Sequence, residues 1–133
     1  MITSVKTLAR RRKLTRIDHF GELLGIKVIE LKDSYAKVSL KITKNHLNFH
    51  GVTHGGAIFS LADCAFAEAS NSGNKTAVAI QVSINYLRPT LEGDELTAEA
   101  VKISESKTFS LFTITVYKEN KIAAVFQGLA YKQ

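Results

Sequence analysis

The second half of the chain alternates apolar and polar residues, the pattern of β-strands with one face in the core and one in water. Four such runs are separated by segments rich in Gly, Pro, Asn and Ser, which favour turns. The runs are Thr76 to Arg88, Leu96 to Ser104, Thr108 to Lys118 and Ile122 to Lys132. Because the connections between the last three are short, we expect them to be antiparallel neighbours.

The first half predicts a hairpin and a helix. Gly25 to Asp33 and Tyr35 to Thr43 alternate in the same way and predict two more strands. In Ala57 to Asn71, by contrast, ten of fifteen residues are apolar, mostly Ala, and there is no Gly or Pro. Such a segment is typical of a helix that is buried on most sides. We therefore predict an α+β fold, in which an antiparallel sheet of about six strands wraps around a long central helix.

Charge is concentrated at the N-terminus. The 133 residues carry a net charge of +6, and residues 1–17 hold six basic and no acidic side chains, which leaves 12 basic and 12 acidic residues in 18–133. We predict a basic N-terminal arm or helix over 1–17 and a single domain over 18–133. A neutral domain gives no reason to expect nucleic-acid binding. The arm also meets the loose description of a mitochondrial transit peptide, although we expect a cytoplasmic protein.

The composition gives no sign of a membrane span or of an internal disulfide. The longest uncharged run, Asn45 to Ala62, contains three histidines, so no membrane span is expected. The single cysteine, Cys64, cannot form an internal disulfide and is expected to be a small core residue.

The polar loop and the helix that follows it carry the candidate chemistry. Gly55 and Gly56 stand where the helix begins, so unpaired backbone N–H groups are expected there and could form an oxyanion hole. Asp63 lies among apolar neighbours, and desolvation is expected to raise its pKa and make it a base or nucleophile near neutral pH. Eight helical residues separate Gly55 from Asp63, about 12 Å along the axis. Two antiparallel copies of the chain could instead bring them together, which favours a catalytic dimer.

Each of these features also has a structural interpretation. Asp63 could be buried for a hydrogen bond, and the glycines could simply form a tight turn.

His46, His50 and His54 recur every four residues, as metal ligands on a helix do. Gly51 between them and the absence of a His-Glu-x-x-His pattern disfavour a metal site.

A longer pattern surrounds these residues. It consists of Asn48, Gly51, His54-Gly55-Gly56, Phe59 to Asp63, Ala65-Phe66-Ala67, Asn71, Tyr86-Leu87-Arg88-Pro89, Gly93-Asp94 and Lys107-Thr108. Over about residues 20–133 the chain resembles hotdog-fold acyl-CoA thioesterases of the phenylacetic-acid-degradation (PaaI-like) type. The resemblance implies a hotdog fold, a homodimer with a continuous sheet, and a homotetramer made of two dimers.

The resemblance also implies roles for individual residues. The backbone N–H of Gly55 would polarise the thioester carbonyl, with His54 shaping the turn. Asp63 of the facing subunit would activate water or attack directly, and Asn48 would orient the water or the thioester. The CoA moiety would be held at a strand end and at a turn by Arg88, Pro89, Thr90, Ser106, Lys107 and Thr108.

We therefore expect hydrolysis of a medium-chain or aromatic acyl-CoA, with no cofactor other than the CoA of the substrate. Phe59 is a candidate for the acyl pocket, although core packing explains it equally well. Ala79 stands where some members of the family place a serine that positions the water, so another group would have to do that work. The alternative is a non-catalytic acyl-CoA sensor or carrier. A hydratase is disfavoured because its Asp-x-Asn-Pro pattern is missing.

Overall fold

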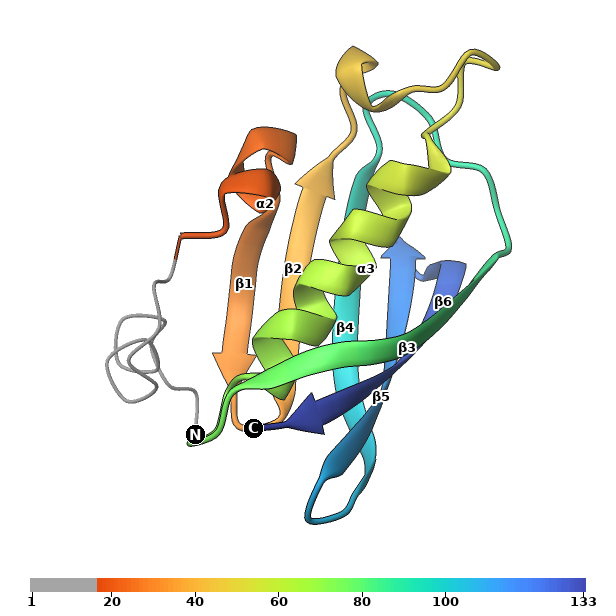
Figure 1. Ribbon diagram of the computed structural model, residues 1–133. Coiled ribbons are helices and arrows are strands. Elements are labelled where there is room, and N and C mark those ends of the chain that lie inside the picture. The colour runs from red at the N-terminus through yellow and green to blue at the C-terminus, as the bar shows by residue number, and fades with distance from the viewer. Residues whose placement is uncertain (1–16) are drawn as a thin grey trace.

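The computed structural model describes residues 17–133 (Figure 1), so the basic arm predicted over 1–17 lies, apart from Ile17, outside the described residues. The helices are α2 (His19–Leu24), the short 3-10 helix η1 (Lys44–His46) and α3 (Gly55–Ser70). The strands are β1 (Lys27–Lys32), β2 (Tyr35–Lys41), β3 (Ala77–Tyr86), β4 (Glu95–Glu105), β5 (Phe109–Lys118) and β6 (Lys121–Lys132).

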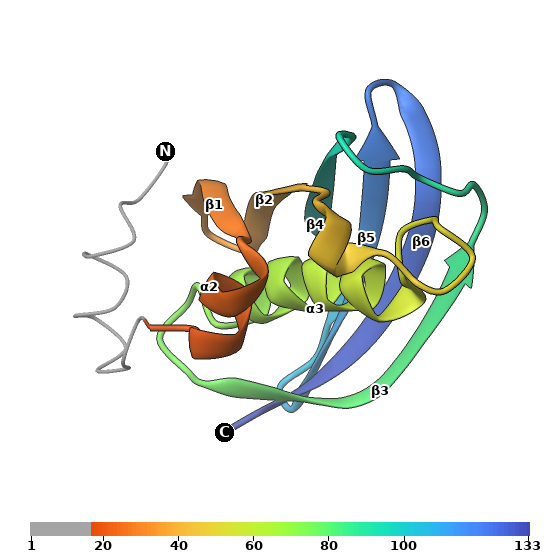
Figure 2. The same cartoon turned by 90° about the horizontal axis from the view of Figure 1, so that it is seen from above.

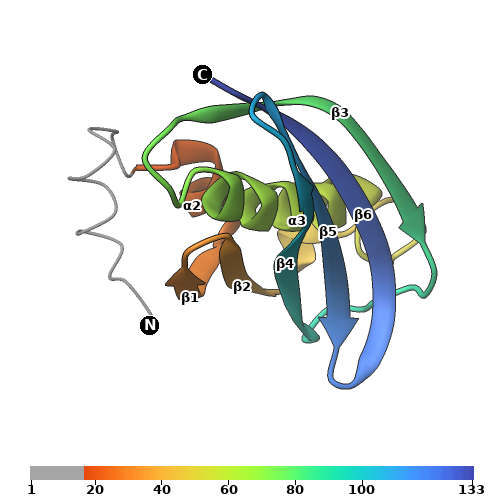
Figure 3. The same ribbon diagram turned by 90° about the horizontal axis from the view of Figure 1, so that it is seen from below.

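The six predicted strands form one antiparallel sheet in the order β1-β2-β4-β5-β6-β3. Figures 2 and 3 show that the sheet curves around α3, with β1 and β3 at its two edges. The predicted fold class is confirmed. The helix α3 begins at Gly55, at the predicted glycine pair and two residues before the apolar run that starts at Ala57. The side chain of His54 caps it by accepting a hydrogen bond from Gly56 N–H.

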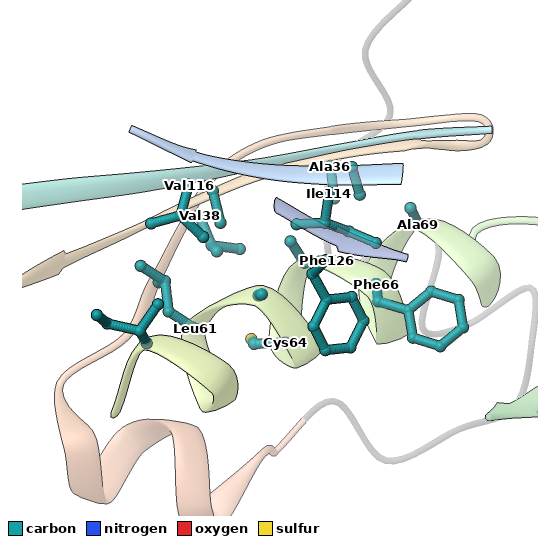
Figure 4. Close-up of a cluster of buried hydrophobic side chains, with 14 of the residues drawn as sticks. Ala36, Val38, Leu61, Cys64, Phe66, Ala69, Ile114, Val116 and Phe126 are labelled. Atoms are coloured by element: carbon teal, nitrogen blue, oxygen red, sulfur yellow. The ribbon is translucent and has the colours of Figure 1, made fainter. Parts of the chain in front are cut away.

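The core lies between α3 and the concave face of the sheet (Figure 4). Alternate residues of β2 and β4 that face α3 are small or aliphatic and fully buried: Ala36, Val38, Leu40, Leu96, Ala98 and Ala100. Towards β5 and β6 the core contacts are aromatic. The ring centroid of Phe66 on α3 lies 5.8 Å from that of Phe112 and 6.0 Å from that of Phe126. None of the helices in residues 17–133 is both long and apolar enough to cross a membrane.

One close approach in this core is testable. A Cβ atom on Gly128 of β6 would lie 2.7 Å from ring carbons of Phe66, which is itself buried. We expect Gly128→Ala to lower the free energy of unfolding by about 1–3 kcal/mol, because the ring or the strand must shift. Urea denaturation measures this, with Gly73→Ala as the control, since nothing lies within 4 Å of a Cβ at Gly73. Equal stability of the two variants would contradict this packing.

Candidate active site

The turn that leads into α3 is anchored to other elements by hydrogen bonds. The N–H of Thr53 donates to the carbonyl of Thr90 at 2.9 Å, and the N–H of His54 donates to that of His46 at 2.7 Å. The hydroxyls of Thr53 and Thr90 are 2.7 Å apart and both side chains are buried. The hydroxyl of Thr90 therefore holds the turn in place, and the expected contact between Thr90 and CoA stays a prediction.

The three regularly spaced histidines do different things. In His46, Nδ1 accepts from Thr43 N–H at 2.9 Å, so Nε2 carries the proton and donates to the carbonyl of Leu24 at 2.7 Å. His46 thus ties the end of α2 to the loop before α3. His54 caps α3, while His50 is exposed. Within residues 17–133, no three His, Cys, Asp or Glu side chains are grouped so as to hold a metal ion.

The first turn of α3 leaves one backbone donor without a partner. The first four N–H groups of a helix have no ordinary intrahelical acceptor. Here the N–H of the cap residue His54 donates to the His46 carbonyl at 2.7 Å, Gly56 N–H donates to His54 Nδ1 at 2.8 Å, and Ala57 N–H donates to the His54 carbonyl at 3.0 Å. No atom of residues 17–133 accepts from Gly55 N–H. This donor also carries the partial positive charge of the helix N-terminus.

A pocket of about 290 Å³ opens beside this donor. It is lined by Val52, Thr53, Gly55, Ile58, Tyr86, Leu87, Arg88 and Pro89. The structure thus brings Gly55 together with Arg88 and Pro89, two of the predicted CoA contacts. Arg88 is exposed and forms no ion pair with another described residue, so its guanidinium is available to a phosphate.

A neighbouring pocket of about 440 Å³ adds cations that had no predicted role. Arg88, Pro89 and Thr90 line it together with the β5–β6 turn, which contributes Lys118 and Lys121. Lys118 is paired with Asp94 at 3.2 Å. The chain brings this turn to Arg88 only through the strand order of the sheet, so no local sequence signal could have identified these lysines.

Asn48 shapes the loop before α3. Its Oδ1 accepts from His50 N–H at 2.9 Å and from Val52 N–H at 3.3 Å. Its side-chain NH₂ group has no hydrogen-bond partner among residues 17–133. If Asn48 orients a water or a thioester, as predicted, it must do so as a donor through this NH₂ group.

Asp63 lies two turns along α3, on the side that the sheet leaves uncovered. This side carries small or polar residues that are exposed or half-buried: Gly56, Ser60, Asp63, Ala67 and Ser70. Burial raises the pKa of Asp63 above its ordinary value, and the negative charge of Asp18 raises it further. The predicted direction of the shift is therefore present in the structure.

Asp18 is a neighbour of Asp63 that had no predicted role. It caps α2 by accepting from Gly21 N–H at 2.9 Å, and its other carboxylate oxygen lies 3.7 Å from Cys64 Sγ. Burial, followed by the charge of Glu68, raises the pKa of Cys64 to about 12, so the thiol stays neutral near pH 7. Cys64 belongs to the hydrophobic core, as predicted.

A single chain does not bring all the predicted residues together. Gly55 and Asp63 belong to one continuous helix, about 12 Å apart along its axis. The turn of Ser106, Lys107 and Thr108 lies at the opposite end of β4 from the loop that contains Arg88 (Figure 1), and the eleven residues of β4 span about 30 Å.

The remaining predicted residues have structural surroundings of their own. Ser106 Oγ accepts from the N–H groups of Thr108 and Phe109 at 3.3 and 3.0 Å and so forms the β4–β5 turn, while Lys107 is exposed. Phe59 is half-buried on α3, and its ring meets that of Phe126 edge-on with centroids 5.3 Å apart.

The raised pKa of Asp63 predicts an effect on stability. The folded protein holds this proton more tightly than the unfolded chain, so the ionised carboxylate costs stability at neutral pH, and the cost vanishes below about pH 3.8, where both states are protonated. Asp63→Asn should therefore raise the free energy of unfolding at pH 7, and the gain should shrink as the pH falls. Chemical denaturation at several pH values measures this, with the exposed Asp33→Asn as control. An Asp63→Asn protein less stable than wild type at pH 7 would contradict the prediction.

Several known proteins are similar to this chain in sequence and in fold. A protein of Archaeoglobus fulgidus is 44% identical over 116 residues, which cover 86% of this chain and 75% of that protein. The acyl-coenzyme A thioesterase PaaI of Escherichia coli is 38% identical over 116 residues, covering 86% and 83% of the two chains. The solved structure of E. coli PaaI, from the phenylacetic acid degradation operon, matches 98% of this chain and 96% of its own with a TM-score of 0.88 and 34% identity.

A crystal structure from Streptococcus mutans, bound to acetyl CoA, matches with a TM-score of 0.78 and 25% identity, covering 82% of this chain and 89% of that one. The model of the thioesterase superfamily matches residues 50–124, which include the helix α3 and the free donor at its start. The resemblance to PaaI-like proteins is confirmed, and the chain belongs to the thioesterase superfamily.

Proposed function

We propose that this protein hydrolyses acyl-CoA thioesters to the free acid and CoA. The observation that carries the proposal is the unpartnered N–H of Gly55, a residue that lines the same pocket as Arg88, which forms no ion pair with another described residue. A thioester has a carbonyl oxygen for the first group and CoA phosphates for the second. The activity named for E. coli PaaI and the acetyl CoA bound to the S. mutans protein support this substrate class.

The catalytic unit that we propose is a dimer formed through β3. This edge strand is ten residues long, and it exposes Val78 and Ile80 by 46% and 54%. A long edge strand with exposed apolar residues invites pairing with another strand. A two-fold axis beside β3 and perpendicular to the sheet would continue the sheet and set two copies of α3 antiparallel, with their small-residue sides facing. Gly55 of one copy would then approach Asp63 of the other.

In this site the carbonyl oxygen accepts a hydrogen bond from Gly55 N–H. The carboxylate of Asp63 from the second copy takes a proton from water, whose oxygen adds to the carbonyl carbon, or it attacks that carbon itself. Negative charge develops on the carbonyl oxygen and is stabilised by the Gly55 donor at the positive end of α3. Collapse of this intermediate breaks the C–S bond and releases CoA as a thiolate. If water was the nucleophile, the other product is the free acid, and the proton held by Asp63 passes to the thiolate. If Asp63 attacked, its acyl anhydride is then hydrolysed by water, which releases the acid and restores the carboxylate. The donor NH₂ group of Asn48 lies in the adjoining loop and would hold the water or the carbonyl.

The same dimer would assemble the CoA contacts. Because a two-fold axis reverses the direction of the sheet, the Arg88 end of one copy lies towards the Lys107 end of the other. Two cations from different chains would thus serve the phosphates of one CoA, and Lys121 adds a third beside Arg88. We extend the proposal to a tetramer made of two such dimers.

Apolar surface for the acyl group lies on both sides of α3. Phe59, Val82 and Ile84 are partly buried between α3 and β3. On the other side, a pocket of about 300 Å³ next to His54 and Gly56 includes Phe20 and Leu24 of α2. Surfaces of this limited size and aromatic character support a medium-chain or aromatic acyl group.

The chemistry of Gly55 and Asp63 can be tested by release of free thiol from a panel of short, medium, long and aromatic acyl-CoAs. Gly55→Pro removes the N–H, and proline fits both the first helical position and the extended His54 before it, whose φ and ψ are −62° and 136°. We expect kcat to fall about 10²- to 10³-fold. Asp63→Asn should cost about 10²- to 10⁴-fold.

Gly55→Ala is the matched control, because it adds the same Cβ beside Tyr86 but keeps the N–H. Its kcat should stay well above that of Gly55→Pro. Turnover that is equal in Gly55→Pro and Gly55→Ala would contradict the donor role of Gly55. Tight acyl-CoA binding by the wild-type protein without any thiol release would instead support a sensor or carrier.

A further inference from the structure

The peptide group between Gly55 and Gly56 is held at both ends. Its carbonyl, which belongs to Gly55, accepts from the hydroxyl of Tyr86 at 3.0 Å. Its N–H, which belongs to Gly56, donates to Nδ1 of His54 at 2.8 Å. The ring of Tyr86 also covers Gly55, since a Cβ there would lie 3.3 Å from Cζ and from the hydroxyl oxygen. Two side chains from different parts of the chain thus fix one peptide plane.

This peptide plane adjoins the one that carries the free N–H of Gly55. The free N–H of Gly55 belongs to the preceding peptide group, and the two groups meet at the Cα of Gly55. Glycine can rotate more freely about φ and ψ than any other residue. Once the following plane is fixed, the direction of the free N–H relative to it depends only on the φ and ψ of Gly55. An oxyanion donor is effective when its direction is set before the charge develops.

We propose that Tyr86 is a positioning residue, whose hydroxyl fixes the direction of the Gly55 N–H towards the thioester oxygen. The proposal rests on the function proposed above. Tyr86 is the last residue of β3, the strand through which we propose that the dimer forms. Its hydroxyl therefore ties the donor to the same strand that brings in the second copy and its Asp63.

Tyr86→Phe tests the proposal, because it keeps the ring against Gly55 and removes only the hydroxyl. We expect kcat for the best acyl-CoA of the panel to fall about 5- to 10-fold, the effect of losing one neutral hydrogen bond, with KM changed less than about twofold. Tyr131→Phe is the control. Tyr131 is similarly exposed, at 41% against 51% for Tyr86, but lies on β6 with its ring against Phe109. It should leave both constants unchanged.

Two inhibitors separate positioning from a general structural effect. S-(2-oxoalkyl)-CoA has a ketone oxygen that can accept from Gly55 N–H, whereas S-alkyl-CoA has none. Tyr86→Phe should weaken binding of the ketone several-fold, measured by calorimetry, and leave binding of the thioether unchanged. Equal weakening of both would show that the hydroxyl supports the pocket as a whole. That result, or unchanged kcat and ketone binding, would overturn the proposal.

A readout without turnover keeps this test separate from the proposed function. If the wild-type protein released no thiol from any acyl-CoA, the proposed function would fail, but the two peptide groups could still be observed by NMR. Loss of the Tyr86 hydroxyl should speed hydrogen exchange of the Gly56 amide at least several-fold, while core amides of β5 stay unchanged. An unchanged Gly56 exchange rate would contradict the positioning role whether or not the protein is a thioesterase.

Discussion

The burial of α3 inside the curved sheet is the constraint on which the rest of the structure depends. Its apolar surface is covered by β2, β3, β4, β5 and β6, which leaves one side of small residues open. The start of the helix is therefore held at one end of the sheet, and Asp63 is held on the open side two turns away. Because the helix is rigid, its two chemical groups cannot meet within one chain. A site that uses both groups on one substrate, as we propose, therefore needs a second copy of the chain.

Around the start of α3, hydrogen bonds serve both folding and the proposed chemistry. Three of the first four N–H groups have acceptors among the preceding residues, which stabilises the helix end, and the fourth, of Gly55, has none among residues 17–133. Hydrogen bonds to Thr90, His46 and Tyr86 hold these residues in place. Asp63 is the opposite case, since the burial that raises its pKa costs stability at neutral pH and makes it a stronger base. A cost of this kind at one buried carboxylate is typical of an active site.

The fold and the start of the site could be predicted because their signals are local. Alternation predicts all six strands, and the glycine pair before an apolar run predicts where the donor lies. The contacts that refine the site join residues far apart in sequence: Tyr86 to Gly55 across 31 positions, Thr90 to Thr53 across 37 and Cys64 to Asp18 across 46. These depend on strand register and on how α2 packs, which no local pattern encodes. For the same reason the buried hydroxyl of Thr90 could not be foreseen.

Mixing two inactive chains tests the shared site most directly. Gly55→Pro and Asp63→Asn proteins would be unfolded together in equal amounts, refolded and assayed for thiol release. If Gly55 and Asp63 act from different chains, random pairing leaves both groups intact at about a quarter of the sites, so about a quarter of the wild-type rate should return. Each variant refolded alone should stay inactive. A mixture no more active than the separate variants would contradict a site shared between two copies of the chain.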